Sequence, residues 1–250
     1  MNIRLIKLLT LSSLKSRYRK TFAGIIWVAL NPILLFTAQA LVFKFVLKVD
    51  IENYPLYLLT GLLPWTFISS TLEMTTPQIV MNKDLFKSFK LSPINIILSY
   101  IFDNAITFLF TLSLVMIPCF FIYDLNLINI LIMLIAFIPL FIGISAIALA
   151  LSVLNVFFRD IRFLVSFILN LLFYVTPIFY TIDMFPEKYQ FLFNLNPFYI
   201  LISPFRNAIY ALDYNLFAIS FFKAISLSLI LIIFSNLIWK SKKEKVNLYV

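Results

Sequence analysis

The chain has 250 residues, of which 62% are hydrophobic and only 12% are charged, with a net charge of +9. An ordinary soluble domain is about 45–50% apolar and about 25% charged. This composition excludes a water-soluble fold and predicts one all-α, polytopic membrane domain spanning residues 1–250. The absence of histidine excludes histidine metal sites, Ser-His-Asp triads and histidine proton relays, and the single Cys119 excludes an intrachain disulfide.

Six apolar segments are candidates for transmembrane helices. A helix needs about 20 apolar residues to cross a hydrocarbon core of roughly 30 Å. We therefore predict six spans, at residues 24–47, 54–75, 94–123, 127–158, 163–180 and 218–239.

Residues 190–212, between the fifth and sixth predicted spans, are apolar but interrupted by Pro197, Pro204 and Arg206. Broken backbone at membrane depth is tolerated only against protein or a water-filled cavity. We predict a pair of short re-entrant helices here.

The distribution of lysine and arginine predicts the orientation. With both termini in the cytoplasm, the segments on that side carry 15 of the 20 basic residues. Such an excess marks cytoplasmic loops. The positive net charge is thus mainly a signal of topology and not of nucleic-acid binding.

Residues 1–20 mix six cations with Leu5, Ile6 and Leu9 on one helical face. This pattern fits an interfacial helix on the cytoplasmic leaflet, although a plain basic flank would share the composition.

Two polar connections could contact a partner. Residues 76–93 include an apolar edge among charges, and residues 159–162 form a tight charged hairpin. A solvated connector or a simple charged turn would look the same, and Asp160 could pair with an arginine or cap the next helix. The candidate residues are Lys83, Asp84, Phe86, Lys87, Phe89, Arg159, Asp160 and Arg162.

Glu73 and Asp103 are carboxylates within predicted spans, and such residues are functional candidates because their burial is costly. Both lie near an interface, where a structural role is also expected. The sequence contains no GxxxxGK[ST] phosphate-binding loop and no HExxH or GxSxG motif. It therefore predicts a protein without its own catalytic site or cofactor.

Four motifs in chain order resemble the membrane subunit of bacterial ABC transporters that export O-antigen, capsule or teichoic acid. The first is Arg-Tyr-Arg at 17–19 with Gly-Ile-Ile-Trp at 24–27 and Asn-Pro at 31–32. The others are Tyr-Pro-Leu-Tyr through Leu-Pro-Trp at 54–65, Leu-Asn-Val-Phe-Phe-Arg-Asp-Ile at 154–161, and Thr-Pro-Ile-Phe-Tyr at 176–180 with Asn-Pro at 196–197 and Phe-Arg at 205–206.

The resemblance implies a homodimer of six-span subunits in the bacterial inner membrane, joined to two cytoplasmic ATPase subunits that bind ATP and Mg²⁺. Coupling would fall on residues 82–90 and 159–162, and an external gate on 190–212. A lipid-linked glycan would pass between the subunits. The conduit and gate candidates are Trp27, Trp65, Phe179, Tyr180, Pro197, Phe198, Tyr199 and Arg206; for the aromatic ones, contact with lipid is the alternative.

Three other functions stay open. An ABC permease for drugs or other lipids would share the architecture. An ion-coupled secondary transporter would need Asp103 or Glu73 to titrate. A membrane-embedded glycosyltransferase is disfavoured by the lack of clustered carboxylates and of histidine.

Overall fold

The computed structural model describes residues 3–18, 51–85 and 92–249, with residues 34, 36–39, 41 and 42 as short pieces. Within these residues the chain is helical and has no β-strand, which confirms the all-α prediction. The main helices are α1 (Ile3–Tyr18), α3 (Tyr54–Thr75), α6 (Pro93–Ile122), α7 (Leu127–Phe157), α8 (Ile161–Val175), α9 (Glu187–Leu195), α10 (Pro197–Ile209) and α11 (Tyr214–Tyr249). The short helices are α4 (Gln78–Met81) and η2 (Ile182–Met184).

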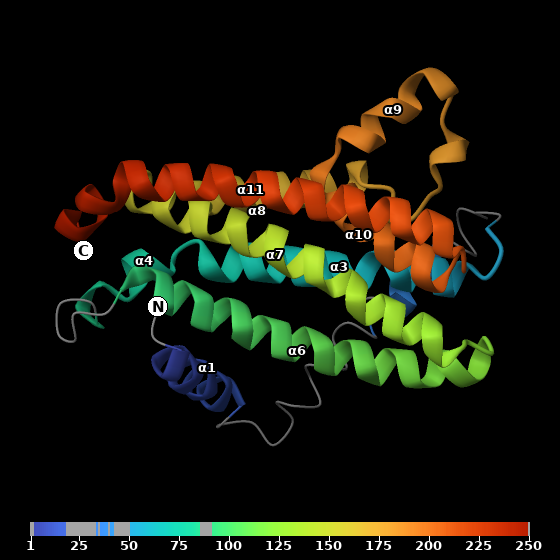
Figure 1. Ribbon diagram of the computed structural model, residues 1–250, viewed down its shortest axis with the longest axis horizontal. Helices are drawn as coiled ribbons and strands as arrows, with labels where there is room; N and C mark the ends of the chain where they lie inside the picture. The colour runs from blue at the N-terminus through green and yellow to red at the C-terminus, as the bar shows by residue number, and fades with distance from the viewer. Residues whose placement is uncertain are drawn as a thin grey trace.

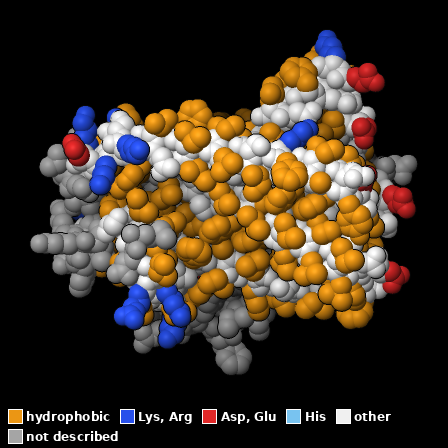
Figure 2. Space-filling view, in the orientation of Figure 1, with side chains coloured by type: hydrophobic (Ala, Val, Ile, Leu, Met, Phe, Trp, Pro, Cys, Tyr) orange, Lys and Arg blue, Asp and Glu red, His pale blue; other side chains and the backbone are white. Residues whose placement is uncertain are grey.

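Long helices run side by side along one axis, with α1 beside α6 and with α9 projecting from the bundle (Figure 1). Both chain ends and α4 lie at the same end of the bundle, called the basic end here. Figure 2 shows lysine and arginine gathered mainly at this end, acidic side chains mainly at the opposite end, and a broad apolar band between. This is the charge distribution of a membrane protein.

Three helices, α6, α7 and α11, are long and apolar enough to cross a membrane, and α8 is apolar but shorter. Helix α3 has the bounds that were predicted for the second span, yet most of its residues are buried within the protein. The predicted span at 24–47 falls almost wholly outside the described residues.

Two helices have C-terminal ends that differ from the prediction by five residues or more. Helix α8 ends at Val175, five residues before the predicted end, because Thr176 precedes Pro177 and takes an extended conformation. Helix α11 continues ten residues past its predicted end. The extension is rich in lysine and contains a glutamate, and these residues favour a helix in water.

Close helix packing depends on small residues. A Cβ atom on Gly143 of α7 would lie 2.9 Å from the Ser228 Oγ of α11. Ser228 Oγ donates to the Pro139 carbonyl at 2.7 Å. The α7–α11 pair is therefore fixed by a small-residue contact and an interhelical hydrogen bond, as is common in membranes.

Helix α10 contains Pro204, which cannot donate to the carbonyl of Ile200 one turn earlier. The Ser203 hydroxyl donates to that carbonyl instead, at 3.1 Å. The helix thus continues through its proline, and two helices occupy the segment that was predicted to be re-entrant.

Candidate functional site

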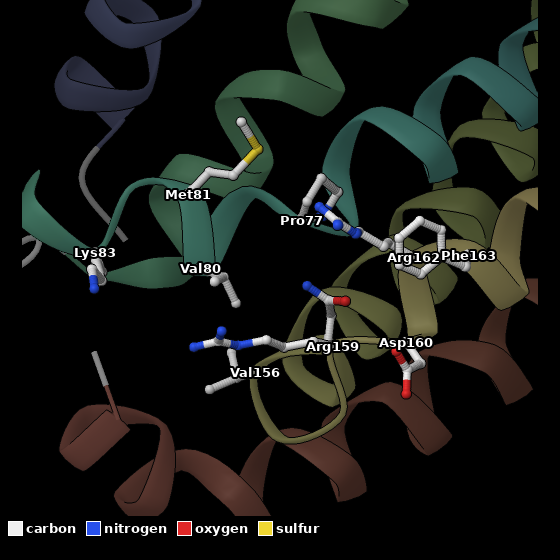
Figure 3. Close-up of a pocket in the computed structure, with 10 residues that line it drawn as sticks. Pro77, Val80, Met81, Lys83, Val156, Arg159, Asp160, Arg162 and Phe163 are labelled. Carbon is white, nitrogen blue, oxygen red and sulfur yellow. The ribbon is translucent and has the colours of Figure 1, made fainter.

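The two predicted coupling segments meet at the basic end of the bundle. Lys83, Arg159, Asp160 and Arg162 all line one cavity of about 510 Å³, together with apolar residues of α4 and of the α7–α8 turn. In Figure 3 the Arg159 side chain extends from the turn toward Val80, whereas the Asp160 side chain points away from Val80. The site therefore presents three cations and one carboxylate within an apolar rim.

Two cation–aromatic contacts border the turn that carries these charges. Asp160 occupies the N-cap position of α8, but its side chain makes no capping hydrogen bond. The Arg162 guanidinium lies 4.5 Å from the ring centre of Phe163. Lys242 Nζ, on α11, lies 5.2 Å from the Phe157 ring centre, so the C-terminal helix also borders the turn.

The remaining coupling candidates are Asp84, Phe86, Lys87 and Phe89. Asp84 is exposed and does not line the cavity. Phe86, Lys87 and Phe89 lie outside the described residues.

A second cluster lies around the extended segment 176–180, which follows α8. Arg206 of α10 is only 9% exposed. Its Nη1 donates to the Pro177 carbonyl at 2.7 Å and its Nη2 to the Ile178 carbonyl at 3.4 Å. The guanidinium carbon also lies 3.9 Å from the ring centre of Tyr57.

Tyrosines of α3 hold the next two carbonyls. Tyr54 donates to the Phe179 carbonyl at 3.3 Å, and Tyr57 donates to the Tyr180 carbonyl at 2.6 Å. Four successive carbonyls of a non-helical segment thus accept side-chain hydrogen bonds. Such compensation is what irregular backbone in a membrane domain requires. We call this cluster, Tyr54, Tyr57, Arg206 and residues 177–180, the carbonyl clamp.

Tyr210 extends the clamp to the loop before α3. Its hydroxyl donates to the Glu52 carbonyl at 2.9 Å, and its ring meets Tyr57 edge-on at 5.0 Å. Tyr210 therefore ties the end of α10 to the loop before α3.

Asn196 joins α9 to α10. Its Oδ1 accepts from the Phe198 and Tyr199 amides at 3.0 and 3.3 Å, and its Nδ2 donates to Thr176 Oγ1 at 2.9 Å. With Pro197 at the first helical position, this is a favourable helix start.

We expect Asn196→Ala to lower the free energy of unfolding by about 1–2 kcal/mol, the usual loss for an N-cap. Asn194→Ala, at an exposed position of α9, is the matched control and is expected to change little. Thermal unfolding of the purified protein in detergent measures both. Equal effects of the two substitutions would contradict the capping role.

The predicted conduit aromatics lie mostly inside the protein. Trp65, Phe179 and Phe198 are buried. The Trp65 ring centre is 5.7 Å from both Phe173 and Phe198. Tyr180, Tyr199 and Pro197 are half-buried, and Trp27 lies outside the described residues.

The two intramembrane carboxylates differ in exposure. Asp103 is fully buried and accepts a hydrogen bond from Ser13, and Thr10 donates to the Ser99 carbonyl at 3.2 Å. These contacts dock α1 on α6. Glu73 is exposed and accepts a hydrogen bond from Ser166 of α8 at 3.1 Å.

Sequence reasoning missed the roles of Tyr57 and Gly61. A Cβ on Gly61 would lie 2.8 Å from Arg206 Nη2, so the guanidinium occupies the space that glycine leaves. The rarity of glycine was a usable signal, since the chain has only three.

A family model described as "ABC-2 type transporter" matches residues 4–210, and the chain belongs to this family of transport subunits. It is a multi-pass protein of the bacterial inner membrane. The chain is 31% identical over 245 residues to "O-antigen export system permease protein RfbA" of Klebsiella pneumoniae, covering 93% of this chain and 92% of the relative. A second K. pneumoniae protein of that name is 34% identical over 81% of this chain and 78% of its own length. The Myxococcus xanthus protein of that name is 27% identical over 79% of this chain and 76% of its own length.

Proposed function

We propose that this chain is the transmembrane subunit of an ATP-driven exporter that moves a lipid-linked polysaccharide of the O-antigen, capsule or teichoic acid type. The observation that carries the proposal is the meeting of residues 77–83 and 159–162 in one basic cavity, in a chain of the ABC-2 family. The names of the relatives support a glycan as the substrate.

The basic end is the cytoplasmic end in this proposal. Lys/Arg excess favours the cytoplasmic side, and both chain ends lie there (Figures 1 and 2). Six spans would then cross the membrane, and α9 and α10 would form an external gate. The carbonyl clamp would fix the backbone on which this gate turns.

ATP and Mg²⁺ would be bound by two copies of a separate ATPase subunit, and two copies of this chain would form the conduit. The cavity at the basic end would receive side chains of the ATPase, acidic groups on its three cations and apolar groups on its rim. Movement of the ATPase would thus push on α4 and on the start of α8. This chain would supply moving parts and no reacting group.

Reconstituted transport tests the proposal. The chain and its ATPase are placed in liposomes with the native lipid-linked glycan, and transfer across the membrane is measured with ATP or with an ion gradient. We expect transfer with ATP alone. Transfer that needs only an ion gradient would favour a secondary transporter, and transport of small drugs or other lipids but not of the glycan would favour the other kind of ABC permease.

A further inference from the structure

The accessible side of α3 is polar, although its interior side is apolar. Between Leu56 and Thr75 the residues that are not buried are Thr66, Ser69, Ser70, Glu73 and Met74. Their spacing of three to four residues places them along one face of the helix. A helix that faced lipid would show the opposite pattern, as α6 does with Ile106, Phe110 and Ile117 exposed.

Helix α8 widens this polar face. Ser166 donates to Glu73 Oε1 at 3.1 Å, and Asn170, one turn further along, is exposed and donates to the Ser166 carbonyl at 2.9 Å. We call Thr66, Ser69, Ser70, Glu73, Ser166 and Asn170 the polar stripe.

The stripe is ordered from behind by α6. Asn104, which is buried, donates to Ser70 Oγ at 2.8 Å and to Thr71 Oγ1 at 2.7 Å. The Ser70 hydroxyl in turn donates to the Thr66 carbonyl. A connected network of this kind fixes the side chains and resists rearrangement.

The stripe reaches deep into the membrane region. Thr66 and Asn170 lie nine residues from the ends of their helices at the basic end, which corresponds to roughly 14 Å at 1.5 Å per residue. This is nearly half of a hydrocarbon core of roughly 30 Å. Asn170 is exposed at that depth, and its amide therefore borders water or a polar partner, because contact of such a group with lipid is costly. Thr66 is half-buried, and its hydroxyl donates to the Leu63 carbonyl at 2.7 Å.

We infer that the polar stripe lines the path of the sugar chain, and that Glu73 makes this path selective for neutral or cationic chains over polyanionic ones. This rests on the proposed function and narrows it, since teichoic acids are polyanions and would be disfavoured. Hydroxyl groups of sugars can donate to the Glu73 carboxylate and to the Asn170 amide oxygen and can accept from the amide NH₂ group. Glu73 is the one charged residue of the stripe, whereas the arginines nearest to it on α8 and the preceding turn line the cavity at the basic end. A chain with a negative charge in each repeat would therefore be repelled on this wall.

Cysteine labelling tests the inference in nanodiscs, where both ends of the protein are accessible. The native, buried Cys119 is replaced by alanine, and single cysteines are placed by Ser70→Cys and Asn170→Cys. Leu171→Cys is the matched control, since Leu171 is exposed on α8 at the same depth but outside the stripe. Each variant is treated with a cationic and an anionic methanethiosulfonate reagent of similar size.

We expect the stripe cysteines to react at least about tenfold faster than Leu171→Cys, because the reactive thiolate forms only where water reaches it. The ratio of the rate with the cationic reagent to the rate with the anionic reagent should be about three- to tenfold higher for Ser70→Cys than for a free thiol in solution. This is the effect expected of the Glu73 charge one helical turn away in partly hydrated surroundings. Adding Glu73→Gln should abolish this preference. Equal rates at stripe and control positions would overturn the aqueous path, and a preference that survives Glu73→Gln would overturn the role of Glu73.

The class of sugar chain is tested by protection. A neutral dextran oligomer should slow the labelling of Ser70→Cys, and sulfated dextran of the same length should not. Absence of protection by the neutral oligomer, or equal protection by both, would contradict the inference. These measurements need neither the ATPase nor ATP, so their failure is distinct from failure of the transport assay.

Discussion

Arg206→Met is expected to lower the free energy of unfolding by about 3 kcal/mol or more, because a hydrogen bond to a charged group contributes about 1.5–3 kcal/mol and its loss leaves buried carbonyls unsatisfied. Methionine keeps the bulk of the side chain but cannot donate to the Pro177 and Ile178 carbonyls that Arg206 now satisfies. The contact of the cation with the Tyr57 ring is also lost. Unfolding of the purified protein in mixed detergent micelles measures the change.

Lys243→Met is the matched control, because it removes one positive charge from an exposed position of α11 beyond the predicted sixth span. It should change the stability by less than about 0.5 kcal/mol, as is usual for surface substitutions. Limited proteolysis provides a local measurement, since loss of the clamp should expose residues 176–181 to cleavage. If Arg206→Met is as stable and as resistant to protease as the control variant, the clamp does not hold this segment.

The effect of Gly61→Ala on the free energy of unfolding is expected to depend on residue 206. The substitution should destabilise the native chain and stabilise the Arg206→Met variant. In the native chain its methyl group would lie 2.8 Å from Arg206 Nη2 and 3.3 Å from Ile178 Cγ2, so the pinned guanidinium must give up contacts. We expect a loss of about 1–3 kcal/mol, the usual effect of overpacking a buried site. In the Arg206→Met background the flexible methionine can move aside, and alanine should stabilise the helix by up to about 1 kcal/mol over glycine.

The four proteins of this double-mutant cycle are compared in the same unfolding assay. A coupling free energy of about 1.5 kcal/mol or more is expected between the two positions. Additive effects would mean that Gly61 is required for a reason other than the position of the guanidinium, such as the contact with Ile178.

The helices could be predicted because their signals are local. Residues 54–75 form α3 with the predicted bounds, since an apolar run with proline at the second position favours a helix there. The end of α8 at Val175 was missed by five residues, although the Thr176-Pro177 pair was a local signal for it. The depth at which α3 is buried was not predictable, because burial depends on which helices pack around it.

The candidate site also has features that the local sequence predicts and features that depend on packing. Charge and spacing identified Arg159, Asp160 and Arg162 as one turn, but only packing of α4 against α7 brings Lys83 to the same cavity. Arg206 was identified through resemblance, while its partners are backbone carbonyls, which have no signature in the sequence. Trp65, Phe179 and Phe198 are buried in the single chain, and their role in a conduit stays a prediction, because apolar side chains carry the same sequence signal in a core and in a conduit.

Co-purification of the chain with the product of a neighbouring ATPase gene tests the central claim most directly. ATP turnover of the complex is measured for the native chain and for the Arg159→Ala/Asp160→Ala double variant, with Lys223→Ala as the control for a substitution outside the cavity. We predict a stable complex whose turnover falls by tenfold or more, on the order of 1.4 kcal/mol of lost coupling, in the double variant and is unchanged in the control. If no ATPase binds, or if both variants turn over ATP at the native rate, the cavity at the basic end is not the coupling site.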